Sequence, residues 1–362
     1  MDDMVMSLLQ KNYTNKTVLV TGHTGFKGSW LSAWLIKLGA KVIGYSIDIP
    51  TEPDHFMLLD LDIVDIRADI RDKNRLNEVI EQYRPEFIFH LAAQPIVSTS
   101  YSDPLETLST NILGTATMLD VLREIDYSCT AIMITSDKCY HNVEWEWGYR
   151  ENDRLGGKDI YSASKAGAEI IYHSYFESFL KNSTVRTATV RAGNVIGGGD
   201  WAKDRIVVDA VNAWAQDLSV EIRSPNATRP WQHVLEPLSG YLHLAILLSK
   251  DKKFNGESYN FGPRAEQNRK VVDLISDLSQ FWQLKEPYTI AKNANFGEAN
   301  LLKLSCDKAL AHMGWQATLD YQETVEMTSR WYFDYYHHKQ INTSAQIEHF
   351  ENIAKERALP WA

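Results

Sequence analysis

The chain has 362 residues, 44% of them hydrophobic, which is enough to bury a large core in one big domain or two coupled domains. Its net charge of −10 argues against general binding of nucleic acid through a basic surface. The three cysteines show no C-x-x-C spacing, so neither a disulfide framework nor a zinc site is expected, and a reducing, cytoplasmic compartment is favoured. No apolar run reaches the ~18 residues that span a bilayer, and the N-terminus, with two Asp and no basic segment, predicts no signal peptide.

Strand-like and helical patterns alternate along the chain. Strands are predicted at 17–21, 42–47, 63–68, 86–91, 130–135 and 184–191, with helices between them at 26–38, 73–83, 105–125 and 161–180. This alternation predicts an α/β fold, a Rossmann-type doubly wound parallel sheet with helices on both faces.

The pattern loosens after Arg191 into a glycine-rich loop. The last third mixes a short strand at 257–261 with helices at 268–282 and 321–336, which we interpret as a smaller C-terminal substrate-binding lobe over the open edge of the sheet. The expected division is a nucleotide-binding domain with the catalytic residues at 1–192, a segment that is mainly substrate lobe at 193–340 and a polar tail at 341–362.

A glycine-rich turn follows the first predicted strand. The sequence Gly22-x-x-Gly25-x-x-Gly28, with Thr24 and Phe26 inside it, leads directly into a helical pattern. A strand, a glycine turn and a helix N-terminus together present free backbone N–H groups and the positive end of a helix dipole to a pyrophosphate. A glycine-rich turn without a ligand is the alternative, but the strand before it and the helix after it favour a dinucleotide site.

The second predicted strand leads to Asp48, 20 residues after Gly28. An acidic residue at this distance accepts hydrogen bonds from the adenosine ribose hydroxyls and repels a 2′-phosphate. No Arg or Lys occurs between Asp48 and Arg67, so we expect NAD rather than NADP as the cofactor. A solvated turn residue is the alternative for Asp48.

Two neighbouring elements carry groups suited to proton transfer. Tyr161 and Lys165 are four residues apart at the start of a helix, so their side chains share one face. A lysine ammonium beside a phenol favours the phenolate, which would lower the Tyr161 pKa from about 10 toward working pH. Ser136 follows the strand at 130–135, at the edge where open α/β sheets bind ligands, and is expected to hydrogen-bond a reacting hydroxyl.

These residues resemble the extended branch of the short-chain dehydrogenase/reductase superfamily and, within it, the CDP-glucose 4,6-dehydratases. The resemblance extends from about residue 17 to about residue 333. It is carried by specific runs such as Thr21-Gly-His-Thr-Gly-Phe-Lys-Gly-Ser-Trp-Leu31 and Thr135-Ser-Asp-Lys-Cys-Tyr140, with others at 147–152, 191–205 and 229–240. It implies NAD-dependent dehydration of CDP-D-glucose to CDP-4-keto-6-deoxy-D-glucose, a step of deoxysugar and O-antigen biosynthesis.

The resemblance also implies a role for each catalytic residue. Tyr161, aided by Lys165 and Ser136, takes the proton of the carbon-4 hydroxyl while NAD accepts hydride from carbon 4. Lys138 then removes the carbon-5 proton, protonated Asp137 donates to the departing carbon-6 hydroxyl, and hydride returns to carbon 6. An Asp-Lys pair matches the CDP-glucose enzymes, whereas related dTDP-sugar dehydratases carry Asp-Glu.

The Asp-Lys pair carries a physical condition. A free lysine has a pKa of about 10.4, so Lys138 can act as a base only if burial and the charge of Lys165 lower that pKa considerably. Asp137 needs the opposite shift to be protonated. An Asp137–Lys138 ion pair that only orients the loop therefore stays open as an alternative.

The resemblance places further residues in two binding sites. Those implied for NAD are Asp69, Ile70, Ala92 and Ala93, and those implied for the substrate are Gln94, Asn194, Arg205 and Arg229. The two arginines suit the substrate diphosphate because guanidinium forks match phosphate oxygens. For Asn111, a structural role and a proton-relay role are both open.

The same residues leave other functions open. A nucleotide-sugar 4-epimerase shares the Tyr-Lys pair and also returns the hydride, but it has no need for an acid–base pair after Ser136. A dehydratase of another nucleotide sugar is a second alternative, and a non-catalytic NAD-binding regulator is disfavoured by the intact catalytic set. The predicted helices at 105–125 and 161–180 carry apolar stripes, and the resembling family pairs these helices across a two-fold axis. We therefore expect a homodimer or a higher homo-oligomer, with no nucleic-acid or membrane partner.

Overall fold

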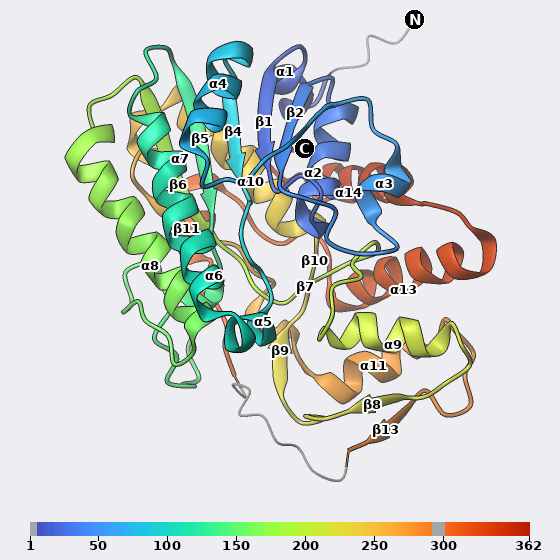
Figure 1. Cartoon of the computed structure of the whole chain (residues 1–362). Coiled ribbons are helices and arrows are strands. Elements are labelled where there is room, and N and C mark those ends of the chain that lie inside the picture. Colours follow the sequence, from blue (N-terminus) through green and yellow to red (C-terminus); the bar gives the residue numbers. More distant parts are fainter. Residues whose placement is uncertain (1–5, 292–300) are drawn as a thin grey trace, which may run out of the picture.

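The computed structural model describes residues 6–291 and 301–362 (Figure 1). The two N-terminal Asp residues, on which the signal-peptide prediction rests, lie outside the described residues. Among the helices of the described segments, none is both long and apolar enough to cross a membrane.

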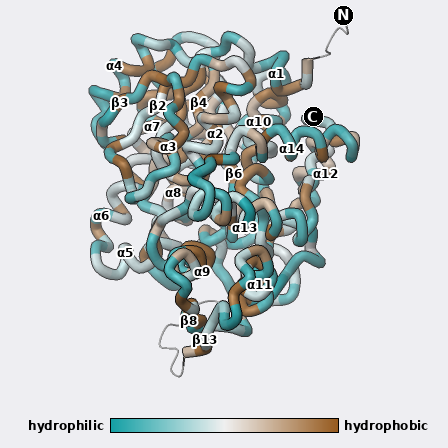
Figure 2. The backbone as a smooth tube through the Cα atoms, turned by 90° about the vertical axis from the view of Figure 1, so that its right-hand side faces the viewer, coloured by the Kyte–Doolittle hydropathy of each residue, from teal (hydrophilic) through white to brown (hydrophobic). Residues whose placement is uncertain are grey.

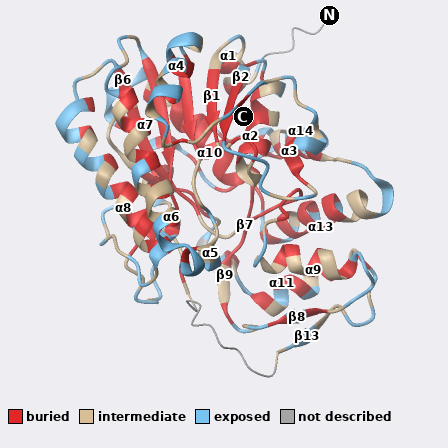
Figure 3. Cartoon of the chain, in the orientation of Figure 1, coloured by how far each residue is buried: buried red, intermediate tan, exposed pale blue. Residues whose placement is uncertain are grey.

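A seven-stranded parallel sheet forms the centre of the molecule, in the order β11-β6-β5-β4-β1-β2-β3. Its strands are β1 (Thr17–Thr21), β2 (Lys41–Ser46), β3 (Val64–Arg67), β4 (Phe87–His90), β5 (Cys129–Ile134), β6 (Val185–Arg191) and β11 (Ser258–Asn260). Figure 3 shows most of these strands buried, as expected for a sheet covered on both faces. The predicted Rossmann-type doubly wound fold is confirmed, and the first six strands lie within about one residue of their predicted bounds.

The helices of the chain cover both faces of this sheet and build the lobe beside it. They are α1 (Leu8–Tyr13), α2 (Phe26–Lys37), α3 (His55–Leu59), α4 (Lys73–Tyr83), α5 (Val97–Ser102), α6 (Pro104–Leu108), α7 (Gly114–Leu122), α8 (Ile160–Tyr175), α9 (Ile206–Trp214), α10 (Leu235–Lys250), α11 (Val271–Ser279), α12 (Asp307–Met313), α13 (Tyr321–His338) and α14 (Thr343–Glu356). Side chains of β1 alternate between two cores: Leu19 packs with α4, α7 and α8, whereas Val18 and Val20 pack with α2 and α10.

Two predicted helices contain a local change of winding. The pattern at 105–125 is divided into α6, a π-helical turn at Ser109–Leu113, and α7, and α8 likewise continues into a π turn at Phe176–Leu180. Such turns occur mostly inside α-helices and are frequent at functional sites. Their hydrophobic spacing is close to that of an α-helix, so the sequence pattern did not reveal them.

The strand predicted at 257–261 lies elsewhere than expected. It forms β11, which pairs with β6 and extends the main sheet, and α10 packs on β5 and β6. The sequence predicts this segment in the smaller lobe, and that prediction is wrong because a short strand does not reveal which sheet it joins. The domain division at residue 192 stays a prediction for the rest of the chain.

The smaller lobe is built from short strand pairs and helices at the bottom right of Figure 1. Its remaining strands are β7 (Val195–Ile196), β8 (Val220–Ile222), β9 (Thr228–Pro230), β10 (Gln232–His233), β12 (Asn268–Lys270) and β13 (Tyr288–Ile290). β8 pairs with β13 and β9 with β12, while α11 packs between α9 and α13. The helix predicted at 268–282 is shorter than expected, because its first three residues form β12.

The predicted polar tail is instead a packed part of the fold. α14 is largely hydrophilic in Figure 2, yet it lies against α2 with Phe350 fully buried. The Phe350 ring stacks on Trp361 with centroids 5.4 Å apart, and Trp34 of α2 meets both rings edge-on. The low proportion of apolar residues hid this contact, because only one face of the helix is buried.

We expect Phe350→Ala to lower the free energy of unfolding by about 3–5 kcal/mol, the usual cost of emptying a buried phenylalanine site. Lys355→Ala, at an exposed position of the same helix, should change it by less than about 0.5 kcal/mol. Urea unfolding of both variants makes the comparison. Equal losses of unfolding free energy in the two variants would show that α14 contributes nothing to the hydrophobic core.

Candidate active site

A deep cleft of about 1290 Å³ lies between the carboxyl ends of the central strands and the smaller lobe. It contains every residue predicted for catalysis and binding. These lining residues are Gly22, Thr24, Gly25, Phe26, Gly28, Asp48, Asp69, Ile70, Ala92, Ala93, Gln94, Ser136, Asp137, Lys138, Tyr161, Lys165, Asn194, Arg205 and Arg229. Their position follows from the parallel sheet, which brings the ends of β1, β4 and β5 to one edge.

The glycine turn between β1 and α2 has the geometry of an anion cradle. Gly22 has a φ of 71°, and a Cβ there would lie 2.8 Å from the backbone nitrogen of Ala92. A Cβ on Gly28 would lie 2.0 Å from the Gly22 carbonyl oxygen, so only glycine allows α2 to approach the turn so closely. No side chain of the described residues caps α2, whose first residues line the cleft. These residues fit a dinucleotide pyrophosphate.

A cation, Arg67, lies next to Asp48 after the end of β2, and its distance along the sequence did not indicate this contact. Asp48 is exposed, and its carbonyl oxygen accepts hydrogen bonds from Thr24 Oγ1 (2.8 Å) and from Arg67 Nη1 (2.9 Å). Arg67 ends the neighbouring strand β3, which explains its proximity despite 19 residues of separation. It also pairs with Asp65 at 2.7 Å, so this cation is held by an acidic partner of its own.

The segment after β4 is tied to the helices behind it. Asn111 accepts a hydrogen bond from the Gln94 nitrogen (2.8 Å) and donates to the Gln94 carbonyl (3.1 Å) and to Ser164 Oγ (2.8 Å). The Gln94 side chain in turn donates to Thr107 Oγ1 and accepts from the Ile96 nitrogen. Of the two roles open for Asn111, these contacts favour the structural one.

Ser136, Asp137 and Lys138 occupy the turn that leaves β5. Ser136 Oγ donates to Asp137 Oδ1 at 3.0 Å and accepts from the Lys138 backbone nitrogen at 3.2 Å. Asp137 is buried but Lys138 is exposed, with its Nζ 5.8 Å from the centre of the Tyr161 ring. The burial that Lys138 needs in order to act as a base is therefore not present in the protein alone. Between these two side chains, both of them described, no ion pair forms.

The electrostatics of Tyr161 differ from the sequence expectation. Burial, and then the charge of Asp137, raise the pKa of Tyr161 to about 12, although a hydrogen bond with Ser136 acts in the opposite direction. Lys165 Nζ lies 5.9 Å from the ring centre, and burial lowers the pKa of Lys165 to about 8. The expected lowering of the Tyr161 pKa is thus not found, because desolvation of the buried phenolate favours the phenol.

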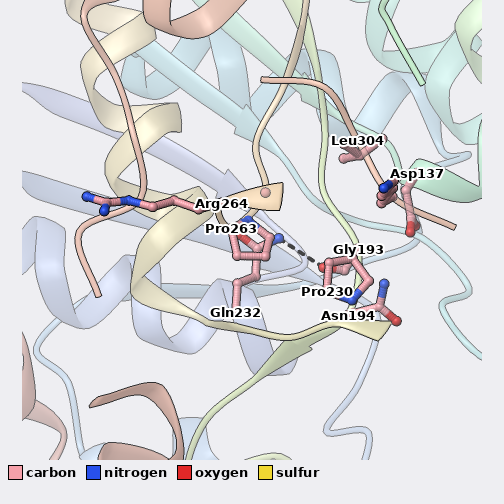
Figure 4. Close-up of a pocket in the computed structure, with 10 residues that line it drawn as sticks. Asp137, Gly193, Asn194, Pro230, Gln232, Pro263, Arg264 and Leu304 are labelled. Atoms are coloured by element: carbon pink, nitrogen blue, oxygen red, sulfur yellow. Dashed lines mark hydrogen bonds between the residues drawn. The ribbon is translucent and has the colours of Figure 1, made fainter. Parts of the chain in front are cut away.

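A glycine behind the acidic residue sets its position. A Cβ on Gly193 would lie 1.9 Å from Asp137 Oδ2, so the carboxylate rests directly on the main chain of the loop after β6. Figure 4 shows Asp137 beside Gly193 and Asn194, with Gln232 Nε2 donating to the Gly193 carbonyl at 2.9 Å. Asn194 has a φ of 53°, a left-handed conformation that is uncommon outside glycine. Sequence analysis selected Asn194 and missed Gly193.

Basic side chains gather at the centre of the cleft. Arg205 forms an ion pair with Asp200, and Lys27, in the first turn of α2, lines the same cavity. Burial, followed by the charge of Arg205, lowers the pKa of Lys27 to about 8 against the opposite effect of Asp137. The sequence pattern did not indicate Lys27, because a lysine at a helix start is usually a solvated residue.

A buried ion pair supports the catalytic turn from behind. Glu169 on α8 accepts two hydrogen bonds from Arg191 at 2.9 Å and others from Thr135 and Thr189, and both members of the pair are almost fully buried. Burial alone would raise the pKa of Glu169, but the charge and hydrogen bonds of Arg191 hold it below its usual value. Arg191 also donates to Tyr140 Oη at 2.6 Å. No local sequence signal pairs these two residues.

The fold and this site define the class of the protein, an α/β protein with a dinucleotide-type turn and proton-transfer groups at one sheet edge. Residues 19–328 match the family model described as GDP-mannose 4,6 dehydratase, so the chain belongs to this family.

One individual protein sequence and two solved structures give more specific similarities. The chain is 43% identical to the CDP-glucose 4,6-dehydratase of Salmonella typhimurium over 333 residues, which cover 90% of this chain and 93% of that protein. Among solved structures, an epimerase from Methanothermobacter thermautotrophicus matches with a TM-score of 0.80 at 22% identity, covering 91% of this chain and 95% of that one. A dTDP-glucose 4,6-dehydratase from Streptomyces venezuelae, solved with NAD, matches with a TM-score of 0.77 at 21% identity, covering 88% and 97%.

We expect Arg191→Met to destabilise the fold by about 3–5 kcal/mol, because it leaves the Glu169 carboxylate buried without its cation. The double variant Glu169→Leu/Arg191→Met should lose less free energy of unfolding than Arg191→Met alone. Since the Glu169 pKa is held low, the stability that the pair contributes is present at neutral pH and is lost as pH falls through that pKa.

Urea unfolding at neutral and acidic pH measures both effects. The exposed pair of Arg330 and Glu326 is the control, and Arg330→Met should cost about 1 kcal/mol or less. A double variant as unstable as Arg191→Met would contradict the charge argument and leave only a packing defect.

Proposed function

We propose that this protein is an NAD-dependent hydro-lyase that converts CDP-D-glucose to CDP-4-keto-6-deoxy-D-glucose. The observation that carries the proposal is the buried Asp137 beside the exposed Lys138, next to Ser136 and Tyr161 in one cleft. The 43% identity to a CDP-glucose 4,6-dehydratase supports the choice of sugar and nucleotide.

The cofactor half of the cleft suits NAD. The start of α2 would bind the pyrophosphate, Asp48 the adenosine ribose, and Asp69 with Ile70 the adenine, while Ala92 and Ala93 would lie along the dinucleotide. When bound there, NAD accepts hydride from carbon 4 and later returns it to carbon 6. Solved relatives of the same fold hold NAD, which supports this assignment.

The other half suits a nucleotide diphosphate. Asn194, Arg205 and Arg229 line the cleft beyond the catalytic turn and would bind the two phosphates, with Gln94 on the opposite wall. Tyr161 would take the carbon-4 hydroxyl proton, Lys138 the carbon-5 proton, and Asp137 would protonate the leaving carbon-6 hydroxyl. Bound sugar and nicotinamide would supply the cover that Lys138 lacks in the protein alone.

A 4-epimerase is the alternative that the same fold allows, and several structural relatives are epimerases. Epimerisation reverses hydride transfer at carbon 4 and gives no role to an acid and a base beside carbons 5 and 6. Mass analysis of the purified protein incubated with CDP-glucose separates the two: loss of one water supports the dehydratase. Unchanged mass with a new isomer would replace our proposal by the epimerase.

Lys138→Ala should still oxidise carbon 4, so reduced nicotinamide should accumulate on the enzyme and be visible by its absorbance. Elimination should stall, and deuterium from the solvent should no longer enter carbon 5, because the base is gone. Lys181→Ala, which removes an exposed lysine that does not line the cleft, is the control. Near-normal dehydration by the Lys138 variant would make this lysine a structural residue only.

We also propose a homodimer formed through α6–α7 and α8. These helices expose large apolar side chains in water, namely Leu105 (76% exposed), Leu113 (58%), Ile170 (55%) and Phe179 (53%). A second copy would cover them across a two-fold axis, the commonest closed symmetry.

Sedimentation should show a dimer at micromolar concentration, and Leu113→Glu/Ile170→Glu should sediment as a monomer because it buries charge in the interface. Ile290→Glu, at an equally exposed apolar position of the lobe, should leave the dimer intact. A wild-type monomer would exclude the proposed assembly.

A further inference from the structure

The loop after β6 lies directly behind the carboxylate of Asp137. A Cβ placed on Gly193 would lie 1.9 Å from Asp137 Oδ2 and 2.4 Å from Asp137 Oδ1, so the carboxylate rests on the Gly193 main chain. On its other side, Asp137 Oδ1 accepts a hydrogen bond from Ser136 Oγ at 3.0 Å. The orientation of this buried carboxylate therefore depends on where the main chain of Gly193 lies.

One buried side chain fixes the main chain of Gly193. Gln232 in β10 is 2% exposed, and its Nε2 donates to the Gly193 carbonyl at 2.9 Å (Figure 4) and to the Phe261 carbonyl at 3.1 Å. An amide nitrogen carries the two N–H donors that such a pair of carbonyls needs. Gly193 follows β6 and Phe261 follows the adjacent strand β11, so Gln232 joins the segments that leave two neighbouring strands of the main sheet.

The remaining polar atoms of Gln232 support the same interpretation. Its main-chain nitrogen donates to the Asn194 carbonyl at 3.2 Å, in the same loop. Its side-chain oxygen is buried and has no hydrogen-bond partner within residues 6–291 and 301–362. A buried polar atom without a partner costs folding free energy and calls for an explanation. In the described structure, the two carbonyls are the only polar contacts of this side chain, so holding them is the role that the contacts assign to it.

We propose that Gln232 is a positioning residue for Asp137: its amide holds Gly193 in place, and Gly193 holds the carboxylate in its orientation toward the sugar. The inference rests on the proposed dehydratase function, in which Asp137 protonates the leaving carbon-6 hydroxyl. Proton donation needs a hydrogen bond to the leaving oxygen, and a misplacement of about 1 Å can slow a step about 10²-fold. Gln232 does not line the large cleft, so it acts through Asp137 and not on the substrate.

The proposal concerns only one of the two half-reactions. Carbon-4 oxidation uses Tyr161 on α8, which is joined to β6 by the ion pair of Glu169 and Arg191 and not by Gln232. Loss of the Gln232 amide should therefore disturb elimination, which needs Asp137, and spare oxidation. A general loosening of the fold would slow both steps.

Gln232→Met removes both donors and keeps the length of the side chain. We expect carbon-4 oxidation within about threefold of wild type and elimination slowed about 10-fold or more, so that reduced nicotinamide accumulates with CDP-glucose. Stopped-flow absorbance measures the oxidation, and mass analysis of quenched samples measures the loss of water. The affinity for CDP, measured by calorimetry, should stay within about threefold, because Asn194 keeps its contact with the Gln232 main chain.

Gln346→Met on α14 is the matched control. Gln346 is also buried, its Nε2 donates to the Met327 carbonyl at 2.7 Å, and it does not line the cleft. This variant should lower thermal stability without changing the ratio of the two rates.

Gly193→Ala is a second test that leaves Gln232 intact and serves also if Gln232→Met does not fold. Its Cβ would displace the Asp137 carboxylate, so elimination should again be the step that stalls.

A double variant tests whether Gln232 acts through Asp137. Asp137→Asn by itself should slow elimination, and adding Gln232→Met should slow it no further, since the effects of two residues that act as one unit do not add. A further loss of about 10-fold in the double variant would overturn the proposal.

Equal slowing of both half-reactions by Gln232→Met, or elimination at the wild-type rate in Gly193→Ala, would also overturn the positioning role and leave the dehydratase intact. Failure of the proposed function looks different: wild type itself would neither reduce its cofactor with CDP-glucose nor release water.

Discussion

The buried ion pair of Glu169 and Arg191 holds together the three elements on which the site depends. Glu169 lies on the helix that carries Tyr161, Arg191 ends β6, and Thr135, which donates to Glu169, immediately precedes Ser136. Burying two charged groups costs folding free energy unless both are hydrogen-bonded, and both members of this pair are. The helix that carries Tyr161 and the turn that carries Ser136 are therefore held in place by a pair that does not line the cleft.

Burial in the cleft shifts the pKa values of neighbouring side chains in opposite directions. Tyr161 and Lys165 are both buried, and burial penalises the charged form of each, so it raises one pKa and lowers the other. Lys27 experiences the same penalty together with the like charge of Arg205. The protonation states of these neighbouring side chains depend on one another. The residue types taken one at a time therefore did not predict them.

Structural likeness alone does not separate the functions that this fold supports. An epimerase and a dehydratase match 91% and 88% of the chain with TM-scores of 0.80 and 0.77, so likeness of fold does not separate them. In the proposed function, the feature that distinguishes a dehydratase is the pair Asp137 and Lys138 on the turn after β5. The position of Asp137 against Gly193 shows how closely the loop after β6 is adapted to that turn.

The sequence by itself determined the parallel sheet, the glycine turn and the set of residues that line the cleft, because each depends on local periodicity or on a strand end. It did not predict that β11 joins the main sheet or that α14 is packed, since short strands and half-buried helices carry weak patterns. It also made the action of Lys138 as a base depend on burial and expected a lowered Tyr161 pKa, whereas Lys138 is exposed and the Tyr161 pKa is raised. Burial and long-range pairs such as Glu169 with Arg191 arise only when distant segments meet, and the tertiary structure alone decided them.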